Sequence, residues 1–138
     1  MIKFFKRLSK YKKRTALIND KKKVSYDEIV KNLKNFDKII DENSVSLLIA
    51  DNNINFIKGY VGFLSKKKNI SILIDESFNN DFFRKIVSLY RPNYIFLPLK
   101  FKKLFKEFKT IHKAHDYLIL KTHFSKHAKL NFKNFLLL

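Results

Sequence analysis

Apolar and polar positions along residues 45–75 predict a strand, a helix and a second strand. Residues 45–50 are almost wholly apolar, as in a strand buried on both faces. A polar turn that can cap a helix follows, and then apolar residues at helical spacing: Ile57, Tyr60, Val61 and Leu64. Residues 70–74 are a second apolar run of strand length. Two buried strands joined by an amphipathic helix make a right-handed βαβ unit with parallel strands.

A short hairpin and a capped helix are predicted before this unit. Residues 15–18 and a return that begins at Val24 flank a polar turn. Ser25 and Glu28 have the spacing of a capping box, in which each side chain accepts from the other residue's backbone N–H. The helix behind the box is expected to reach about residue 41, with one apolar stripe: Ile29, Leu33, Phe36 and Ile40.

After residue 75 the alternation of helix and strand continues. The next helix has a polar cap at Asn79 or Asn80 and ends before Pro92, and its apolar face comprises Phe82, Phe83, Ile86, Val87 and Tyr90. Residues 94–97 are a third core strand. This order predicts an α/β fold with an open, mostly parallel sheet and flanking helices. Residues 99–110 are interpreted as a basic helical stretch, and residues 116–120 and 134–138 as strands.

The length of 138 residues predicts one domain, residues 15–138, preceded by a basic leader helix over residues 1–14 that packs on it. The absence of cysteine excludes disulfides and thiolate metal sites. No apolar run approaches the ~18 residues of a membrane span. The basic N-terminus also lacks the apolar core of a signal peptide, which predicts a cytoplasmic protein.

Positive charge is concentrated at the two ends of the chain. The formal net charge is +18, with +7 in residues 1–14, +8 in residues 100–138 and only +3 between them. Strong basicity is typical of proteins that bind nucleic acid or an anionic membrane, so a small basic binding module is the alternative function. The nearly balanced centre argues against it, and the abundance of Lys, Asn, Ile and Phe is typical of an AT-rich coding sequence.

Residues typical of catalytic or cofactor sites are sparse. The only glycines, Gly59 and Gly62, fall inside the predicted helix, so no phosphate-cradling glycine loop is present. Asp75 and Glu76 follow the second strand, where α/β folds place their sites, but adjacent carboxylates there are more often surface residues.

Four histidines suggest a metal site: His112, His115, His123 and His127. Cysteine is absent and nearby carboxylates are few, so solvated histidines are the favoured interpretation. We therefore assign no catalytic, cofactor-binding or metal-binding residue in this chain.

Several local phrases resemble the N-terminal part of the AMP-binding, acyl-adenylate-forming family, which includes acyl-CoA synthetases and adenylation domains. Residues 15–18 and 24–29 are similar to its opening "TALI…(I/V)SYxEL" phrase. Other scaffold phrases match at residues 46–52, 55–75 and 83–96, and residues 134–138 fall where the family has the strand before its Ser/Thr/Gly-rich phosphate loop. The chain departs from the family at Lys66-Lys67-Lys68, where small residues are usual, and at residues 73–74, where a proline is usual.

The resemblance implies an incomplete AMP-binding N-terminal domain, truncated before the phosphate loop. The parent reaction would be ATP-dependent activation of a carboxylate to an acyl-adenylate, followed by transfer to a thiol. ATP and Mg²⁺ are implied for the full-length family only, because every diagnostic motif would lie beyond Leu138. The expected partners are the remainder of a split ligase and, for the full-length family, a carboxylate substrate. We expect the chain to be inactive alone.

Overall fold

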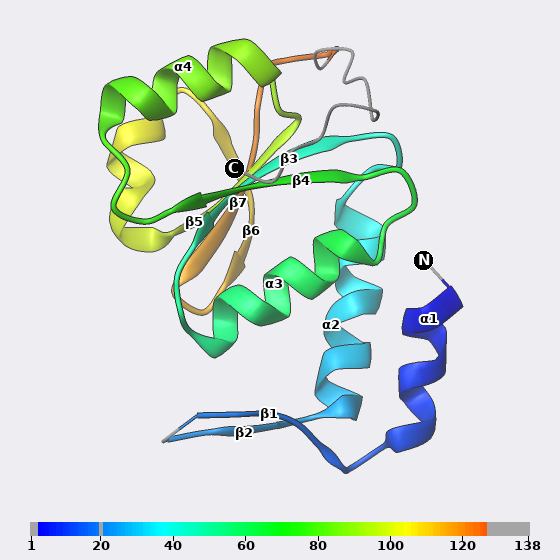
Figure 1. Ribbon diagram of the computed structural model, residues 1–138. Helices are drawn as coiled ribbons and strands as arrows, with labels where there is room; N and C mark the ends of the chain where they lie inside the picture. Colours follow the sequence, from blue (N-terminus) through cyan, green and yellow to red (C-terminus); the bar gives the residue numbers. More distant parts are fainter. Residues whose placement is uncertain (1–2, 20, 127–138) are drawn as a thin grey trace.

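The computed structural model of the chain describes residues 3–19 and 21–126 (Figure 1). In chain order the elements are α1 (Lys3–Lys6), η1 (Arg7–Tyr11), β1 (Thr15–Ile18), β2 (Lys23–Ser25), α2 (Tyr26–Ile39), β3 (Val45–Ala50), α3 (Ile54–Leu64), β4 (Ile70–Asp75), α4 (Asn80–Tyr90), β5 (Tyr94–Pro98), η2 (Leu99–Phe105), β6 (Lys109–Ala114) and β7 (Tyr117–Lys121). Among the described residues, no helix has the length and apolar character needed to cross a membrane.

Five strands form one mixed sheet in the order β4-β3-β5-β7-β6. β4, β3 and β5 run parallel, so the predicted β-α-β-α-β core is confirmed. β7 pairs antiparallel with β5, and β6 pairs antiparallel with β7. The α/β class is thus confirmed, with an antiparallel hairpin extending the parallel half of the sheet.

Helices cover both faces of this sheet (Figure 1). Alternate residues of the central strands point to opposite faces, because the side-chain period of a strand is two. Leu47, Ile49 and Ile95 belong to a core cluster with residues of α4 and η2. Leu48 and Phe96 belong to a second cluster with residues of α2 and α3. The continuous apolar runs of the sequence reflect this burial on both faces.

The N-terminal elements form a third, smaller cluster. β1 and β2 pair antiparallel as the predicted hairpin, outside the main sheet. Val24, Ile29 and Leu33 are buried in this cluster, and Phe5 and Leu8 of the N-terminal helical turns pack partly against it. Residues 3–11 therefore lie against the hairpin and α2 (Figure 1).

All three predicted helix caps are present. Ser25 and Glu28 form the complete capping box of α2. The Asn53 side chain accepts from the Phe56 N–H at 2.8 Å and caps α3. The Asn79 side chain accepts from the Phe82 N–H at 2.7 Å and caps α4. These local signals depend on neighbouring residues only, so the sequence suffices to predict them.

The predicted apolar face of α3 is confirmed only in part. Ile57, Tyr60 and Val61 are partly buried against the core, but Leu64 is 37% exposed. The buried residues of the helix are Ile54, Phe56, Gly59, Gly62 and Phe63. A Cβ added to Gly59 would lie 2.1 Å from Cζ of Phe96, and one added to Gly62 would lie 2.5 Å from the Phe36 ring. The two glycines let the α3 backbone approach the sheet, and a count of apolar side chains does not detect them.

The prediction that both strands of the first βαβ unit are buried holds for β3 only. β4 lies at the edge of the sheet, and its Leu73 is 41% exposed. The order of strands decides which run is central, and an apolar run alone does not reveal that order.

Residues 99–110 differ from the predicted basic helix. A 3-10 helix covers the first part only, and residues 109–114 form β6, a strand missed by the sequence analysis. β6 has mostly exposed or half-buried positions, so it lacks an apolar run. The strand at residues 117–121 is confirmed. The strand predicted at residues 134–138 lies outside the described residues.

Candidate functional site

Three carboxylates gather at the carboxyl end of β3 and β4. Ala50 pairs with Asp75, so the turns that follow the two strands lie side by side. A hollow of about 390 Å³ there is lined by Ala50, Asp51, Asn52, Asp75 and Glu76. This is where open α/β sheets usually bind ligands. The structure thus brings both carboxylates considered in the sequence to the expected edge.

Local contacts account for each of these carboxylates. The Asp75 carboxylate accepts from the Ser77 N–H at 2.9 Å and from the Ser77 hydroxyl, and these bonds lower the pKa of Asp75. Glu76 forms an ion pair with Lys100. Asp51 accepts from the Asn53 amide at 2.6 Å. A general acid or base needs a pKa near the working pH, whereas Asp75 is held ionised. The three carboxylates stabilise turns.

The histidines do not form one site. His112 lies on β6 and His115 in the following turn, and both line a pocket against α2 and α3. His123 lies after β7, with its ring centroid 5.4 Å from that of Phe108 and 4.4 Å from that of Phe124. His127 lies outside the described residues. Residues 3–19 and 21–126 contain no group of three potential metal ligands.

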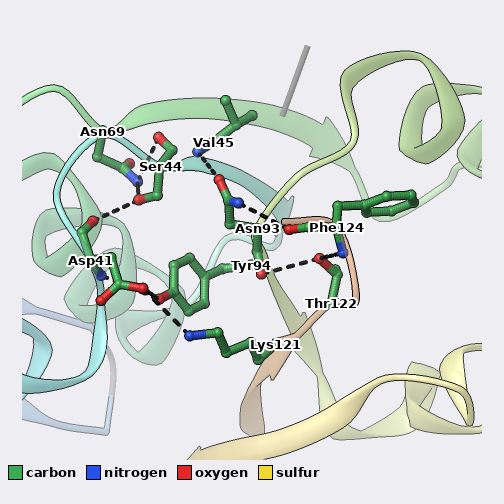
Figure 2. Close-up of polar contacts among 9 residues, drawn as sticks. All are labelled: Asp41, Ser44, Val45, Asn69, Asn93, Tyr94, Lys121, Thr122 and Phe124. Carbon is green, nitrogen blue, oxygen red and sulfur yellow. Dashed lines mark hydrogen bonds and ion pairs between the residues drawn. The ribbon is translucent and has the colours of Figure 1, made fainter. Parts of the chain in front are cut away.

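The densest polar network lies at the amino end of the parallel strands (Figure 2). The Asn93 side chain accepts from the Val45 N–H at 2.9 Å and donates to the Phe124 carbonyl at 3.3 Å. Thr122 donates its hydroxyl to the Pro92 carbonyl at 2.6 Å. Asn69 donates to the Ser44 hydroxyl at 2.7 Å. These bonds join four loops that are far apart in the sequence.

Tyr94 connects this network to the end of α2. Its ring is buried, and its hydroxyl donates to the Asp41 carboxylate at 2.6 Å. Lys121 lies 3.4 Å from the same carboxylate (Figure 2). The Tyr94 hydrogen bond, followed by the charge of Lys121, lowers the pKa of Asp41, and burial raises the pKa of Tyr94. Because its members lie on loops that are far apart in the sequence, the network serves to fix these loops.

A cationic pocket, which we call the α2–α3–β6 pocket, has a volume of about 380 Å³. Its charged lining comprises Lys31, Lys58, Lys113 and Glu28, and its other polar lining comprises Asn32, Asn35, Asn55, His112 and His115. Three ammonium groups against one carboxylate make this hollow positive. No described ion pair involves any of the three lysines.

Two long-range hydrogen bonds hold the walls of this pocket. The Asn32 amide on α2 donates to the Lys58 carbonyl on α3 at 2.7 Å. The Asn55 amide at the start of α3 donates to Asp116, in the turn between β6 and β7, at 2.6 Å. The pocket is therefore built from three elements that are separated in sequence.

The sequence pattern does not reveal this pocket. The only available signal was the pair His112 and His115, which was assigned to a basic solvated segment. The pocket depends on β6, the strand that the apolar pattern missed, and on Gly59 in its lining.

The fold is similar to that of a solved N-terminal subdomain of an adenylate-forming enzyme. Three matching structures are of the Klebsiella oxytoca NpsA N-terminal subdomain, in complex with 3-hydroxyanthranilyl-AMSN, 3-hydroxybenzoyl-AMSN or anthranilyl-AMSN. Each has a TM-score of 0.55 and 13% sequence identity over 66% of this chain. The chain spans about a quarter of the length of these neighbours. No family model and no curated protein matches the chain.

Proposed function

We propose that this chain is the N-terminal α/β part of an acyl-adenylate-forming ligase, such as an acyl-CoA synthetase or an adenylation domain, and acts in the cytoplasm. The observation that carries the proposal is the fold likeness to the NpsA subdomain, which agrees with the resemblance at residues 15–18 and 24–29. At 13% sequence identity, the structural likeness supports the fold only. The ligase activity is what we propose.

The residues present do not fit ATP and Mg²⁺. Both glycines of the chain lie inside α3 and pack against the rings of Phe96 and Phe36, so neither can form a phosphate-binding loop. The carboxylates at the carboxyl end of the sheet are held by Ser77, Lys100 and Asn53. We therefore derive no catalytic step through the nucleotide or the metal. The chain supports a ligase that another polypeptide segment completes.

The first experiment is carboxylate-dependent pyrophosphate exchange. The purified chain alone is expected to show none with a panel of aryl and alkyl carboxylates and Mg²⁺-ATP. The DNA downstream of the Leu138 codon is then searched for a Ser/Thr/Gly-rich phosphate loop in any frame. If such a segment is found, co-expression should give a co-purifying pair with exchange activity. Robust exchange by this chain alone would contradict the proposal.

A second candidate, the basic binding module, is favoured by one specific observation. The basic residues of α1 and η1 are exposed in the described structure: Lys3, Lys6, Arg7 and Lys10. Such a module should bind duplex DNA or anionic vesicles with an affinity that falls steeply between ~50 and ~200 mM salt. Binding that is absent at low salt, or unchanged by salt, would exclude this candidate.

A further inference from the structure

We propose that the α2–α3–β6 pocket binds a small molecule through its phosphate group. This pocket is lined by α2, α3 and β6 and shares no lining residue with the hollow after β3 and β4, and the proposal does not rest on the proposed ligase function. The proposal rests on a preformed hollow, on three ammonium groups that form no described ion pair, and on one carboxylate that already serves a helix cap.

The charge of the pocket is unbalanced because its single carboxylate serves a helix cap. Glu28 accepts from the Ser25 N–H at 3.0 Å, and this bond is the main cause of its lowered pKa. Asp116, near the opposite wall, accepts from Asn55 at 2.6 Å. Neither carboxylate forms a described ion pair with the lysines of the pocket.

Lys58 is the central cation of this site. It is half-buried on α3, and burial, followed by repulsion from Lys22, lowers its pKa, while Glu28 partly offsets this. The charged form of a partly desolvated lysine is unfavourable, so an incoming anion gains more from it than from a fully hydrated lysine. Lys58 shares the lining with Lys31 and Lys113, which favours an anion with several acceptor oxygens.

The geometry favours a small ligand. A volume of about 380 Å³ lies within the usual range of small-molecule sites. The bonds from Asn32 to Lys58 and from Asn55 to Asp116 hold the walls before any ligand arrives, which reduces the cost of ordering them. Amide and imidazole groups of the lining can donate to phosphate oxygens or to hydroxyls of an attached sugar.

The test uses the whole chain labelled with ¹⁵N and three probes: inorganic phosphate, ribose 5-phosphate and ribose. The two phosphate probes are expected to shift the backbone amides of Lys58, His112 and Lys113, and ribose to shift none. If ribose 5-phosphate binds and inorganic phosphate does not, the sugar contributes and the site is still supported. Absence of shifts at the pocket with both phosphate probes would overturn the proposal.

Matched variants separate this site from diffuse charge. Lys58→Met keeps the length and the apolar stem and should weaken phosphate binding about tenfold, as expected for one lost charge-assisted hydrogen bond. Lys67→Met removes an exposed lysine beyond the far end of α3 and should leave affinity unchanged. The amide spectrum of each variant checks that the fold is retained. Equal weakening by both substitutions, or by neither, would overturn the proposal.

Discussion

The two ends of the parallel strands differ in how their polar groups are used. At the amino end, Asn93, Thr122 and Asn69 join loops separated by more than twenty residues. At the carboxyl end, Asp75 contacts Ser77 and Asp51 contacts Asn53, each only two residues away. The amino end is thus a long-range network (Figure 2), whereas at the carboxyl end Asp75 and Asp51 bond within their own turns and Glu76 pairs with Lys100 of η2.

This difference distinguishes polar groups that stabilise the fold from polar groups that could bind a ligand. Open α/β sheets bind ligands at the carboxyl end, which requires polar groups that are free to face a ligand. Here Asp51 and Asp75 stabilise their own turns and Glu76 pairs with Lys100, while the polar network of Asn93, Thr122 and Asn69 lies at the opposite end. In this chain, a large number of polar contacts therefore indicates a structural role. The cationic pocket is a separate feature.

The largest effect is expected at the amino end, from Asn93→Ala. It leaves the buried Val45 N–H without its acceptor and removes the bond to Phe124, so the free energy of unfolding should fall by about 2 kcal/mol. Urea unfolding followed by circular dichroism measures the change. Asn52→Ala, at an exposed position of the carboxyl end, is the matched control and should change stability little. Equal losses of stability from Asn93→Ala and Asn52→Ala would contradict the proposed difference between the two ends of the sheet.

Tyr94→Phe should have the next largest effect, about 1 kcal/mol, because it removes the hydrogen bond to Asp41 and keeps the buried ring. The native pKa of Asp41 is lowered, so its contribution is present above the unfolded-state pKa and is lost as pH falls. The difference between wild type and variant should therefore shrink below about pH 4. A difference that stays constant from pH 7 to pH 3 would show that Asp41 is not the partner.

Asp75→Asn should have a smaller effect, because the side chain is exposed and can still accept from Ser77. We expect no measurable change in the urea midpoint at neutral pH. The lowered pKa of Asp75 predicts that any difference which does appear is lost in acid. A loss of stability as large as that of Asn93→Ala would show that the carboxyl end is a structural network too.

Glu76→Gln should have the smallest effect of all. Its ion pair with Lys100 is exposed, and such pairs contribute little to stability. The thermal midpoint should remain within error of the wild type at both low and high salt. A salt-dependent drop would mean that this pair holds the turn after β4.

Much of the fold could be predicted because its signals are local or continuous. The capping box at Ser25 and Glu28, the cap at Asn53 and the buried run of β3 all follow from neighbouring residues. The buried face of α3 was not fully predicted, because part of it is formed by Gly59 and Gly62. These residues lack a side chain, and this lets the helix backbone approach Phe96 and Phe36. β6 was missed because an exposed edge strand carries no apolar run. The cationic pocket could not be predicted without that strand.

By itself the sequence determined the α/β class, the order of the core elements and their caps, since hydrophobic period and capping chemistry act over a few residues. Only the tertiary structure decided that β4 is an edge strand, that Tyr94 donates to Asp41, and that Lys58 and His112 line one pocket. These three features depend on the order of the strands and on how closely the helices approach the sheet. Both are set by packing between segments that are far apart in the sequence, so they depend on the whole chain.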